Sequence, residues 1–319
     1  MIAVHLESGC VSIVENARPM RSYGFALIRM LSAGICNTDL ELQRGYYGFA
    51  GTPGHEFVGL VLEADTASLV GQRVAGEINL ACGACDFCAI GLGRHCRNRT
   101  VLGIVKHPGA FAEYLSLPEA NLHLVPDEIA TEQAVFIEPL AAACEILDQV
   151  HIPAEKQVAV LGDGKLGLLI AQVLHAQGAH VRLYGRHEEK LQIARKAGIE
   201  TSGSPDLPRA AYPFVVDATG SPDGLRQAVS MVRPRGTVIL KSTVHGETPV
   251  DSASVIVNEV TLIGSRCGRF EPAIELLRAG KIDVTSMVAA EYPLEEAPEA
   301  FAEAARSGVL KVLLRNDAG

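Results

Sequence analysis

Four cysteines lie within fifteen residues of this chain, in the stretch CGACDFCAIGLGRHC. They are spaced as C-x2-C-x2-C-x7-C and are Cys82, Cys85, Cys88 and Cys96. Four thiolates on one short loop complete a tetrahedral zinc site, and a site closed in this way keeps no position for a substrate. We therefore predict a structural zinc here, which explains how a lobe holds its shape but not what the protein does.

Three other interpretations of this cysteine cluster stay open. An iron–sulfur cluster is one, although the ferredoxin pattern ends with a shorter gap and a proline, whereas Arg97 follows the last cysteine here. A redox-active pair would leave the other cysteines unexplained, and thiols without a ligand are the third interpretation. In a reducing cytosol, closely spaced cysteine pairs are more often metal ligands or redox centres than structural disulfides.

A glycine motif in VLGDGKLG predicts a dinucleotide site. Gly162, Gly164 and Gly167 form G-x-G-x-x-G, with Lys165 and Leu166 between the last two, directly after an apolar strand and directly before an apolar helix. The first glycine permits a tight turn, the second lets the backbone approach a pyrophosphate, and the third lets helix and strand pack closely. A glycine-rich turn without a ligand is the alternative.

The end of the next strand bears on which dinucleotide is bound. A site for NAD commonly has Asp or Glu about 20 residues after the motif, where it binds the ribose 2′-hydroxyl. Here the strand ends VRLYGR, so Gly185 stands at that position and Arg186 follows it. A 2′-phosphate would meet no carboxylate and would find a guanidinium, which predicts NADP(H). The alternative is that Glu188 or Glu189 binds the ribose of NAD(H).

The elements that must position these residues belong to two parts of the chain with different sequence patterns. Short β-rich pieces broken by glycine and proline fill the first 120 residues and predict a partly closed antiparallel β-domain. Strands and helices then alternate from Gln157, which predicts a doubly wound parallel α/β sheet. We place the coenzyme domain at 146–268 and the catalytic domain at 1–145 and 269–319, with a hairpin-like stretch ending GVLKVLLRN returning to the latter.

Composition and charge exclude several partners. The 319 residues carry a formal net charge of -9 without a basic cluster, so nucleic acid has no electrostatic footprint to bind. No segment reaches the ~18 uninterrupted apolar residues that span a bilayer, and the N-terminus has no signal-peptide pattern. We expect a cytoplasmic protein that acts on a small molecule.

Three further stretches hold side chains that could do chemistry. They are AGICNTDL with Cys36, Thr38 and Asp39, GTPGHEFVG with His55 and Glu56, and FIEPLAAAC with Glu138. Each has an ordinary structural explanation when taken alone, since a buried cysteine packs as a small hydrophobe and a glutamate in a first helical turn is favoured by the dipole. Together with the cysteine lobe and the glycine motif they form a pattern.

In this order of motifs the whole chain resembles the zinc-dependent alcohol dehydrogenases of the medium-chain dehydrogenase/reductase superfamily. The resemblance covers GICNTDL, GHEFVG, the cysteine lobe, GAFAEY, EPLA and GDGKLG. It implies a GroES-like, partly open β-barrel catalytic domain interrupted by a Rossmann coenzyme domain, and a homodimer or homotetramer.

The resemblance also implies roles for single residues. Cys36, His55 and Glu138 match the ligands of a catalytic zinc, and Glu56 matches a neighbouring glutamate that lies beside the metal or coordinates it transiently. Thr38 matches the hydroxyl that takes the substrate proton, and Asp39 matches a supporting carboxylate. Lys311 is placed like a basic residue near the cofactor pyrophosphate. Glutamate as the third ligand occurs in the polyol, glucose and threonine dehydrogenase branches. Glu41 stands near the place where some relatives have a relay histidine, which leaves the proton exit open.

The function expected from these residues is hydride transfer between a small alcohol and a nicotinamide cofactor. An open zinc site acts as a Lewis acid on an alcohol or carbonyl oxygen. We expect an enzyme that interconverts a secondary alcohol, polyol or sugar with its ketone or aldehyde and prefers NADP(H) to NAD(H). A zinc-independent quinone or enoyl reductase of the same superfamily and a non-catalytic cofactor-binding regulator are the alternatives.

Overall fold

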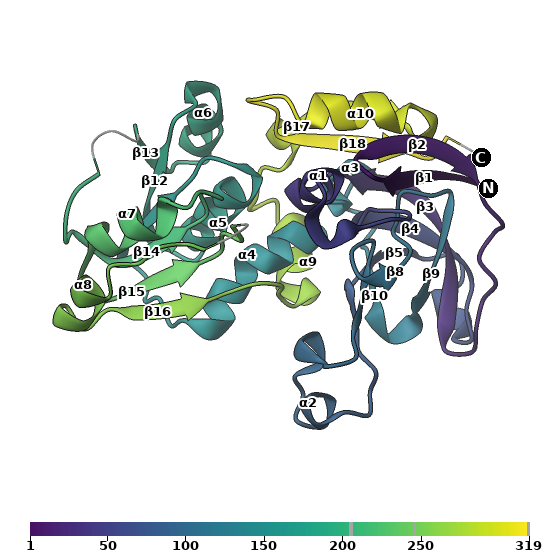
Figure 1. Cartoon of the computed structure of the whole chain (residues 1–319), viewed down its shortest axis with the longest axis horizontal. Coiled ribbons are helices and arrows are strands. Elements are labelled where there is room, and N and C mark those ends of the chain that lie inside the picture. Colours follow the sequence, from purple (N-terminus) through teal and green to yellow (C-terminus); the bar gives the residue numbers. More distant parts are fainter. Residues whose placement is uncertain (204–206, 245–246, 318–319) are drawn as a thin grey trace. The chain divides into compact units, whose positions relative to one another are not determined.

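The computed structural model describes residues 1–203, 207–244 and 247–317. The chain divides into two compact units, one formed by Met1–Glu138 with Val288–Gly319 and the other by Pro139–Met287 (Figure 1). These limits differ from the domain boundaries expected from the sequence, because the helix that follows residue 269 belongs to the second unit. The functional domain boundaries themselves stay a prediction.

The first unit is built mainly of strands. They are β1 (Ile2–Glu7), β2 (Cys10–Glu15), β3 (Phe25–Gly34), β4 (Glu56–Glu63), β5 (Arg73–Gly76), β6 (Asn79–Leu80), β7 (Thr100–Leu102), β8 (Lys106–His107), β9 (Tyr114–Pro118), β10 (Leu122–Leu124), β17 (Val288–Pro293) and β18 (Lys311–Arg315). Its helices are α1 (Asn37–Gln43), α2 (Asp86–Ala89), α3 (Thr131–Ala134) and α10 (Ala297–Ala304). The β-rich texture of the sequence therefore predicts this unit well.

One seven-stranded sheet organises this unit, in the order β10-β5-β4-β3-β18-β17 with β9 also paired to β3. Most of its pairs are antiparallel, but β17 and β18 run parallel. The expectation that the C-terminal strands form a hairpin is therefore wrong. A parallel pair needs a crossover connection, and α10 lies between the two strands in the chain.

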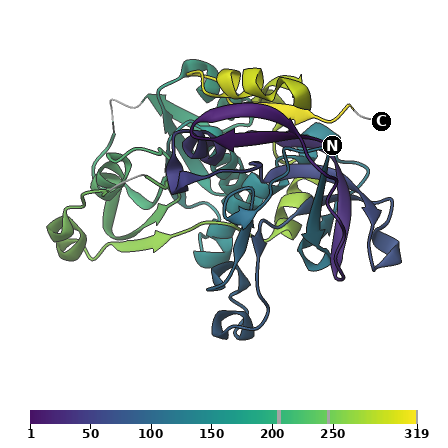
Figure 2. The ribbon, with the colours of Figure 1, turned by 45° about the vertical axis from the view of Figure 1, so that its right-hand side comes forward.

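A hairpin of β1 and β2 lies against this part of the unit (Figure 2). Backbone hydrogen bonds join Val4 to Phe111 and Leu6 to Gly51, so the hairpin is anchored to the loops that flank β4 and β9. Helix α10 contacts β2, and both views show the yellow helix beside the purple hairpin. The C-terminal segment is thus built into the unit that the N-terminus begins.

The second unit is a parallel six-stranded sheet with helices. Its strands are β11 (Gln157–Leu161), β12 (His180–Gly185), β13 (Glu200–Gly203), β14 (Tyr212–Asp217), β15 (Val232–Leu240) and β16 (Thr261–Gly264). Its helices are α5 (Lys165–Ala176), α6 (Glu188–Lys196), α7 (Gly224–Met231), α8 (Ser252–Val257) and α9 (Phe270–Arg278), and most of α4 (Ile137–Gln149) also belongs to it. The strand order β13-β12-β11-β14-β15-β16 confirms the doubly wound sheet predicted from the alternating pattern.

Apolar side chains of the central strands form the core of this sheet. Leu161, Val215 and Val238 are buried there against Ala228 and Met231 of α7. Such near-continuous apolar runs are expected of parallel strands covered on both faces. Between β13 and β14 the described residues 207–211 contain no helix.

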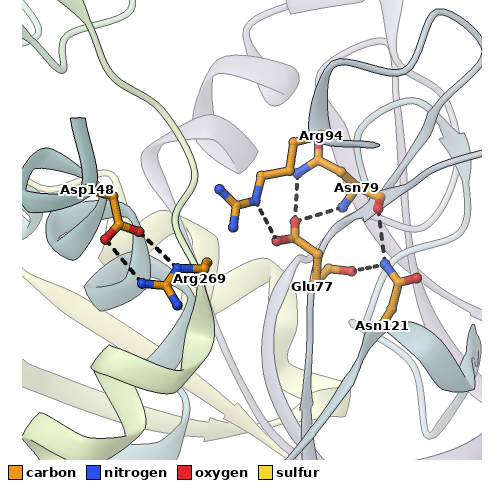
Figure 3. Close-up of polar contacts among 6 residues, drawn as sticks. All are labelled: Glu77, Asn79, Arg94, Asn121, Asp148 and Arg269. Carbon is orange, nitrogen blue, oxygen red and sulfur yellow. Dashed lines mark hydrogen bonds and ion pairs between the residues drawn. The ribbon is translucent and has the colours of Figure 1, made fainter. Parts of the chain in front are cut away.

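An ion pair stabilises the connection to α9. The guanidinium of Arg269 binds both carboxylate oxygens of Asp148, at 3.0 and 3.1 Å, and joins the last turn of α4 to the residue that precedes α9 (Figure 3).

Over the part of the chain that the structure describes, no helix is long and apolar enough to cross a membrane.

Candidate metal centres and dinucleotide site

The four lobe cysteines converge as the spacing predicted. Their sulfur atoms all lie within 4.8 Å of one another, and Cys85 Sγ is 3.5 Å from Cys88 Sγ and 3.6 Å from Cys96 Sγ. Four sulfurs bound to one zinc at about 2.3 Å lie about 3.8 Å apart. The geometry of the lobe therefore fits a tetrahedral metal ion, and none of these thiols forms a disulfide.

The electrostatics of the lobe differ from one thiol to the next. Backbone N–H groups of Cys88 and Arg97 lower the pKa of the Cys85 thiol to about 6. Burial and hydrogen bonds from neighbouring thiols raise the pKa of Cys88 to about 11. The thiols therefore differ in how readily each loses its proton, and a bound cation would favour the thiolate form of all of them.

Glu77 holds the base of this lobe (Figure 3). Its carboxylate accepts hydrogen bonds from the Asn79 side chain at 2.7 Å and from Arg94 Nε at 3.3 Å. The Asn121 amide donates to the carbonyl oxygens of Glu77 and Asn79, at 2.8 and 3.0 Å. One carboxylate therefore joins both ends of the cysteine loop to the strands beneath it.

A second group of side chains that could hold a metal ion lies where β3 ends and β4 begins. The ligand atoms of Cys36, His55 and Glu56 lie within 4.8 Å of one another. Antiparallel pairing explains this, since Gly34 near the end of β3 lies opposite Glu56 at the start of β4. Cys36 and His55, nineteen positions apart in sequence, are thereby brought together, with His55 and Glu56 buried and Cys36 partly exposed.

The Asp39 carboxylate holds the residues of this group in place through hydrogen bonds. Its carboxylate accepts the backbone N–H of Cys36 at 2.9 Å and that of Gly54 at 3.2 Å, and lies 3.4 Å from His55 Nδ1. Burial alone would lower the pKa of His55, but the charges of Asp39 and Cys36 raise it well above its ordinary value. With Nδ1 facing a carboxylate, Nε2 is the ring nitrogen left for a metal.

Gly54 lets the backbone turn before His55 while it passes close to the ring of Phe111. Its φ of +101° lies in the left-handed region, and a Cβ there would meet the ring of Phe111 at 2.4 Å. Any side chain at this position would both strain the backbone and displace the ring. The glycine before the histidine in the GHEFVG stretch is therefore a condition for placing the imidazole.

Glu56 has a buried cation as its partner. The Lys311 ammonium from β18 binds Glu56 Oε2, and each residue is 1% exposed. Lys311 Nζ also lies 5.6 Å from the centre of the Phe136 ring, and a Cβ at Gly34 would come within 3.0 Å of both partners. The sequence suggested a place near the cofactor pyrophosphate for Lys311. The structure places its amine beside the metal-binding group, and a phosphate contact stays a prediction.

Glu138 lies in the first turn of α4, half-buried, and is not one of the three residues gathered above. Burial raises the pKa of its carboxyl to about 7, an effect that the charge of His55 opposes and those of Glu56 and Glu77 reinforce. These influences show that Glu138 belongs to the same electrostatic environment. Its role as a ligand stays a prediction.

Two residues near Cys36 bear on proton transfer. Thr38 Oγ1 lies 3.8 Å from Cys36 Sγ, at the start of α1. Glu41, one turn further along the helix, is exposed to solvent on one side and forms an ion pair with Arg44. The hydroxyl is therefore close to the metal-binding group, whereas the carboxylate is engaged at the surface.

The glycine motif adopts the geometry that its spacing predicted. Gly162 ends the turn after β11 with a φ of +107°, and a Cβ on Gly167 would lie 1.9 Å from the Gly162 carbonyl oxygen. Around Gly164 there is open space, directly before the N-terminus of α5. Close packing on one side and free backbone on the other form a cradle suited to a pyrophosphate.

The end of β12 differs from the expectation in one respect. No side chain at Gly185 supplies a carboxylate, but Asp163 of the glycine motif does. Its Oδ2 accepts the backbone N–H groups of Arg186 and His187 at 2.6 and 2.7 Å. A carboxylate therefore lies at the end of β12 although this strand supplies none, and the preference for NADP(H) stays a prediction.

Known families and proteins share these features. The profile of the alcohol dehydrogenase GroES-like domain matches residues 23–127, and that of the zinc-binding dehydrogenases matches residues 166–279. An L-threonine 3-dehydrogenase of Streptomyces avermitilis is 33% identical over 95% of both chains. A D-arabitol-phosphate dehydrogenase of Enterococcus avium is 29% identical over 96% of this chain and 94% of its own.

Solved structures are similar over nearly the full length. A protein of Sinorhizobium meliloti 1021, solved with NADP bound, has a TM-score of 0.89 and 28% identity, with 98% of each chain covered. A short chain alcohol dehydrogenase of Escherichia coli CFT073, complexed with NADH, has a TM-score of 0.91 and 27% identity, with 99% of each chain covered.

Proposed function

Because this chain belongs to the zinc-dependent alcohol dehydrogenase family of the medium-chain dehydrogenase/reductase superfamily, we propose a specific site for its chemistry: a catalytic zinc held by Cys36, His55 and Glu138. The enzyme interconverts an alcohol and its ketone or aldehyde with a nicotinamide cofactor. Neither the zinc-independent reductase nor the regulator is favoured.

The observation that carries this proposal is the convergence of a thiol and an imidazole beside buried carboxylates. Cys36 and His55 offer sulfur and nitrogen within 4.8 Å, which suits zinc–ligand bonds of about 2.0 to 2.3 Å. Glu56 completes the group but is bound to Lys311, so the third ligand that we propose is Glu138, whose carboxylate lies within the electrostatic influence of His55 and Lys311. When bound there, zinc supplies a Lewis acid for the substrate oxygen.

The residues around the site orient the ligands and handle the proton. Asp39 faces Nδ1 of His55 and so directs the opposite nitrogen to the metal position. The Thr38 hydroxyl both donates and accepts hydrogen bonds, so it can take the proton of an alcohol and pass it on. The Lys311 ammonium binds the Glu56 carboxylate beside the zinc position, and the cofactor supplies the hydride chemistry when it is bound.

For the cofactor we propose NADP(H) in preference to NAD(H). The support is the exposed Arg186, which follows Gly185 and carries a guanidinium suited to a 2′-phosphate. Relatives solved with NADP and with NADH both exist, so the choice depends on this chain's own residues. The ratio of kcat/KM for the two cofactors tests it, and a ratio that favours NAD would overturn it.

As substrate we propose a polyol, a sugar alcohol or another small secondary alcohol. The support is a glutamate, Glu138, at the third ligand position, together with the arabitol-phosphate and threonine dehydrogenases among the relatives. Absorbance at 340 nm with a panel of alcohols and both cofactors tests the class. Turnover of polyols with zinc-loaded protein is expected, and activity that survives complete removal of zinc would contradict the proposal.

We further propose a cytoplasmic homodimer or homotetramer. Thiolates that bind zinc suit a reducing compartment. For assembly, β16 ends the described order of the second sheet, and beside it Ile256 and Val257 of α8 are 73% and 78% exposed. An unpaired strand edge beside exposed apolar side chains is suited to pairing with a second copy.

A further inference from the structure

Asp163 is a buried carboxylate within the glycine motif that the dehydrogenase chemistry does not use. It is 7% exposed, and its Oδ2 accepts two backbone N–H groups at the end of β12. His187 Nδ1 lies 3.1 Å from each carboxylate oxygen. A carboxylate has about four lone-pair sites, so Oδ1 keeps capacity for a further donor.

Gly185 is the reason that Asp163 can lie there. A Cβ on Gly185 would come within 2.4 Å of Asp163 Oδ2 and 2.6 Å of its Cβ. The aspartate therefore fills the space that a side chain at position 185 would occupy. A carboxylate of the glycine motif thus lies at the end of β12, where dinucleotide folds usually have one on the strand itself.

The other acidic residues nearby are already engaged or lie outside. The Glu188 carboxylate is bound by Arg195 of the same helix, in a pair that is largely exposed. Glu189 is exposed on α6. Neither has the burial or the backbone contacts that hold Asp163 at the strand end.

We propose that Asp163 is a specificity-determining residue for the cofactor: its carboxylate accepts the adenosine ribose 2′-hydroxyl of NAD(H) and opposes the 2′-phosphate of NADP(H). This inference rests on the dinucleotide binding in the proposed function. Arg186 attracts a 2′-phosphate while Asp163 repels it, so the two residues act in opposite directions on one group. The preference of the wild-type enzyme for NADP(H) or NAD(H) depends on which of these two opposing effects is larger.

Binding of two adenine fragments tests this without any turnover. Calorimetry with 2′,5′-ADP and with 5′-AMP measures the subsite alone, in the full-length zinc-loaded protein. Asp163→Asn keeps the shape and removes the charge, so the affinity for 2′,5′-ADP rises about tenfold while that for 5′-AMP falls or stays the same. Arg186→Gln should weaken only the binding of 2′,5′-ADP.

A control exists at the other end of these two strands, just before β11 and at the start of β12. Glu155 and His180 form an acid–histidine pair at 2.6 Å at the opposite end of β11 and β12. Glu155→Gln should leave the ratio of the two affinities unchanged. If Asp163→Asn changes the ratio no more than Glu155→Gln does, or weakens the binding of 2′,5′-ADP, the inference is wrong.

A swap variant separates charge from folding. Asp163→Gly combined with Gly185→Asp returns the carboxylate to the strand and should restore a ratio near that of the wild type. This variant carries the test if Asp163→Asn unfolds, and a ratio in the swap that favours 2′,5′-ADP about tenfold more than wild type would contradict the inference. Failure of wild-type protein to bind either fragment would instead overturn the proposed function, and a wild-type preference for 5′-AMP would overturn only the NADP preference.

Discussion

At the residue scale, the buried ion pair of Glu56 and Lys311 is a feature that could not be predicted from the sequence. The two residues are 255 positions apart and meet only because β18 pairs with β3, which in turn pairs with β4. A carboxylate buried beside the ligands needs a permanent counter-charge, since an unpaired buried charge is costly. The lysine therefore couples the C-terminal strand to the metal-binding group.

Replacing this lysine should destabilise the fold. Lys311→Met leaves the Glu56 charge buried without a partner, and we expect a loss of about 3 to 5 kcal/mol in the free energy of unfolding. Urea unfolding measures it. The matched control is Arg315→Gln on the same strand, whose exposed pair with Glu291 is worth less than about 1 kcal/mol. Equal effects of the two substitutions would refute the role given to Lys311.

The Thr38 hydroxyl should matter for turnover and not for metal binding. We expect Thr38→Ala to lower kcat by about 10² to 10⁴, the range of general acid–base contributions, and Thr38→Ser to keep most of it. Zinc content and binding of 5′-AMP should stay as in the wild type. Full activity in the alanine variant would remove Thr38 from the mechanism.

At the scale of elements, the cysteine lobe is a loop held by one carboxylate, with four thiols placed where a metal ion could bind them. Helix α2 has only four residues and none of them is buried, so the lobe has little core of its own. Its order depends on the four thiolates and on Glu77. A metal ion bound there would consequently contribute to the free energy of folding.

Loss of one lobe cysteine should affect stability before chemistry. Cys85→Ser is expected to lose one zinc per chain, to lower the melting temperature and to expose the lobe to proteolysis between residues 82 and 98. Cys10→Ser, at an exposed thiol outside the lobe, is the control and should change none of these. A Cys85→Ser protein that keeps its full zinc content would show that the lobe is not a zinc site.

Elements with a strong local pattern could be predicted from the sequence, and those set by distant pairing could not. The glycine turn and the four-cysteine cluster are short and contiguous, so residue types alone indicate their geometry. The parallel pairing of β17 with β18 and the partner of Lys311 depend on contacts across the sheet, for which the sequence carries no local signal. Asp163 had a signal, since a carboxylate stands inside the motif while Gly185 lacks one.

At the scale of the whole molecule, exposed apolar side chains indicate where copies of the chain should meet. Leu262 of β16 is 38% exposed, beside the two more exposed residues of α8. Val257→Asp should shift the protein toward a monomer in sedimentation or light scattering. Met20→Asp, at a 92% exposed residue of the other unit, should not. An unchanged oligomer in the Val257 variant would place the interface elsewhere.

The chemistry as a whole depends on whether Cys36, His55 and Glu138 share one cation. Anomalous diffraction at the zinc edge, from crystals of the zinc-loaded chain, tests this most directly. The shared zinc site predicts one peak among the four lobe cysteines and a second peak within bonding distance of Cys36, His55 and Glu138, with the Glu138 oxygen at about 2.0 to 2.2 Å. A peak at the lobe alone, or a second peak with Glu138 outside that distance, would contradict it.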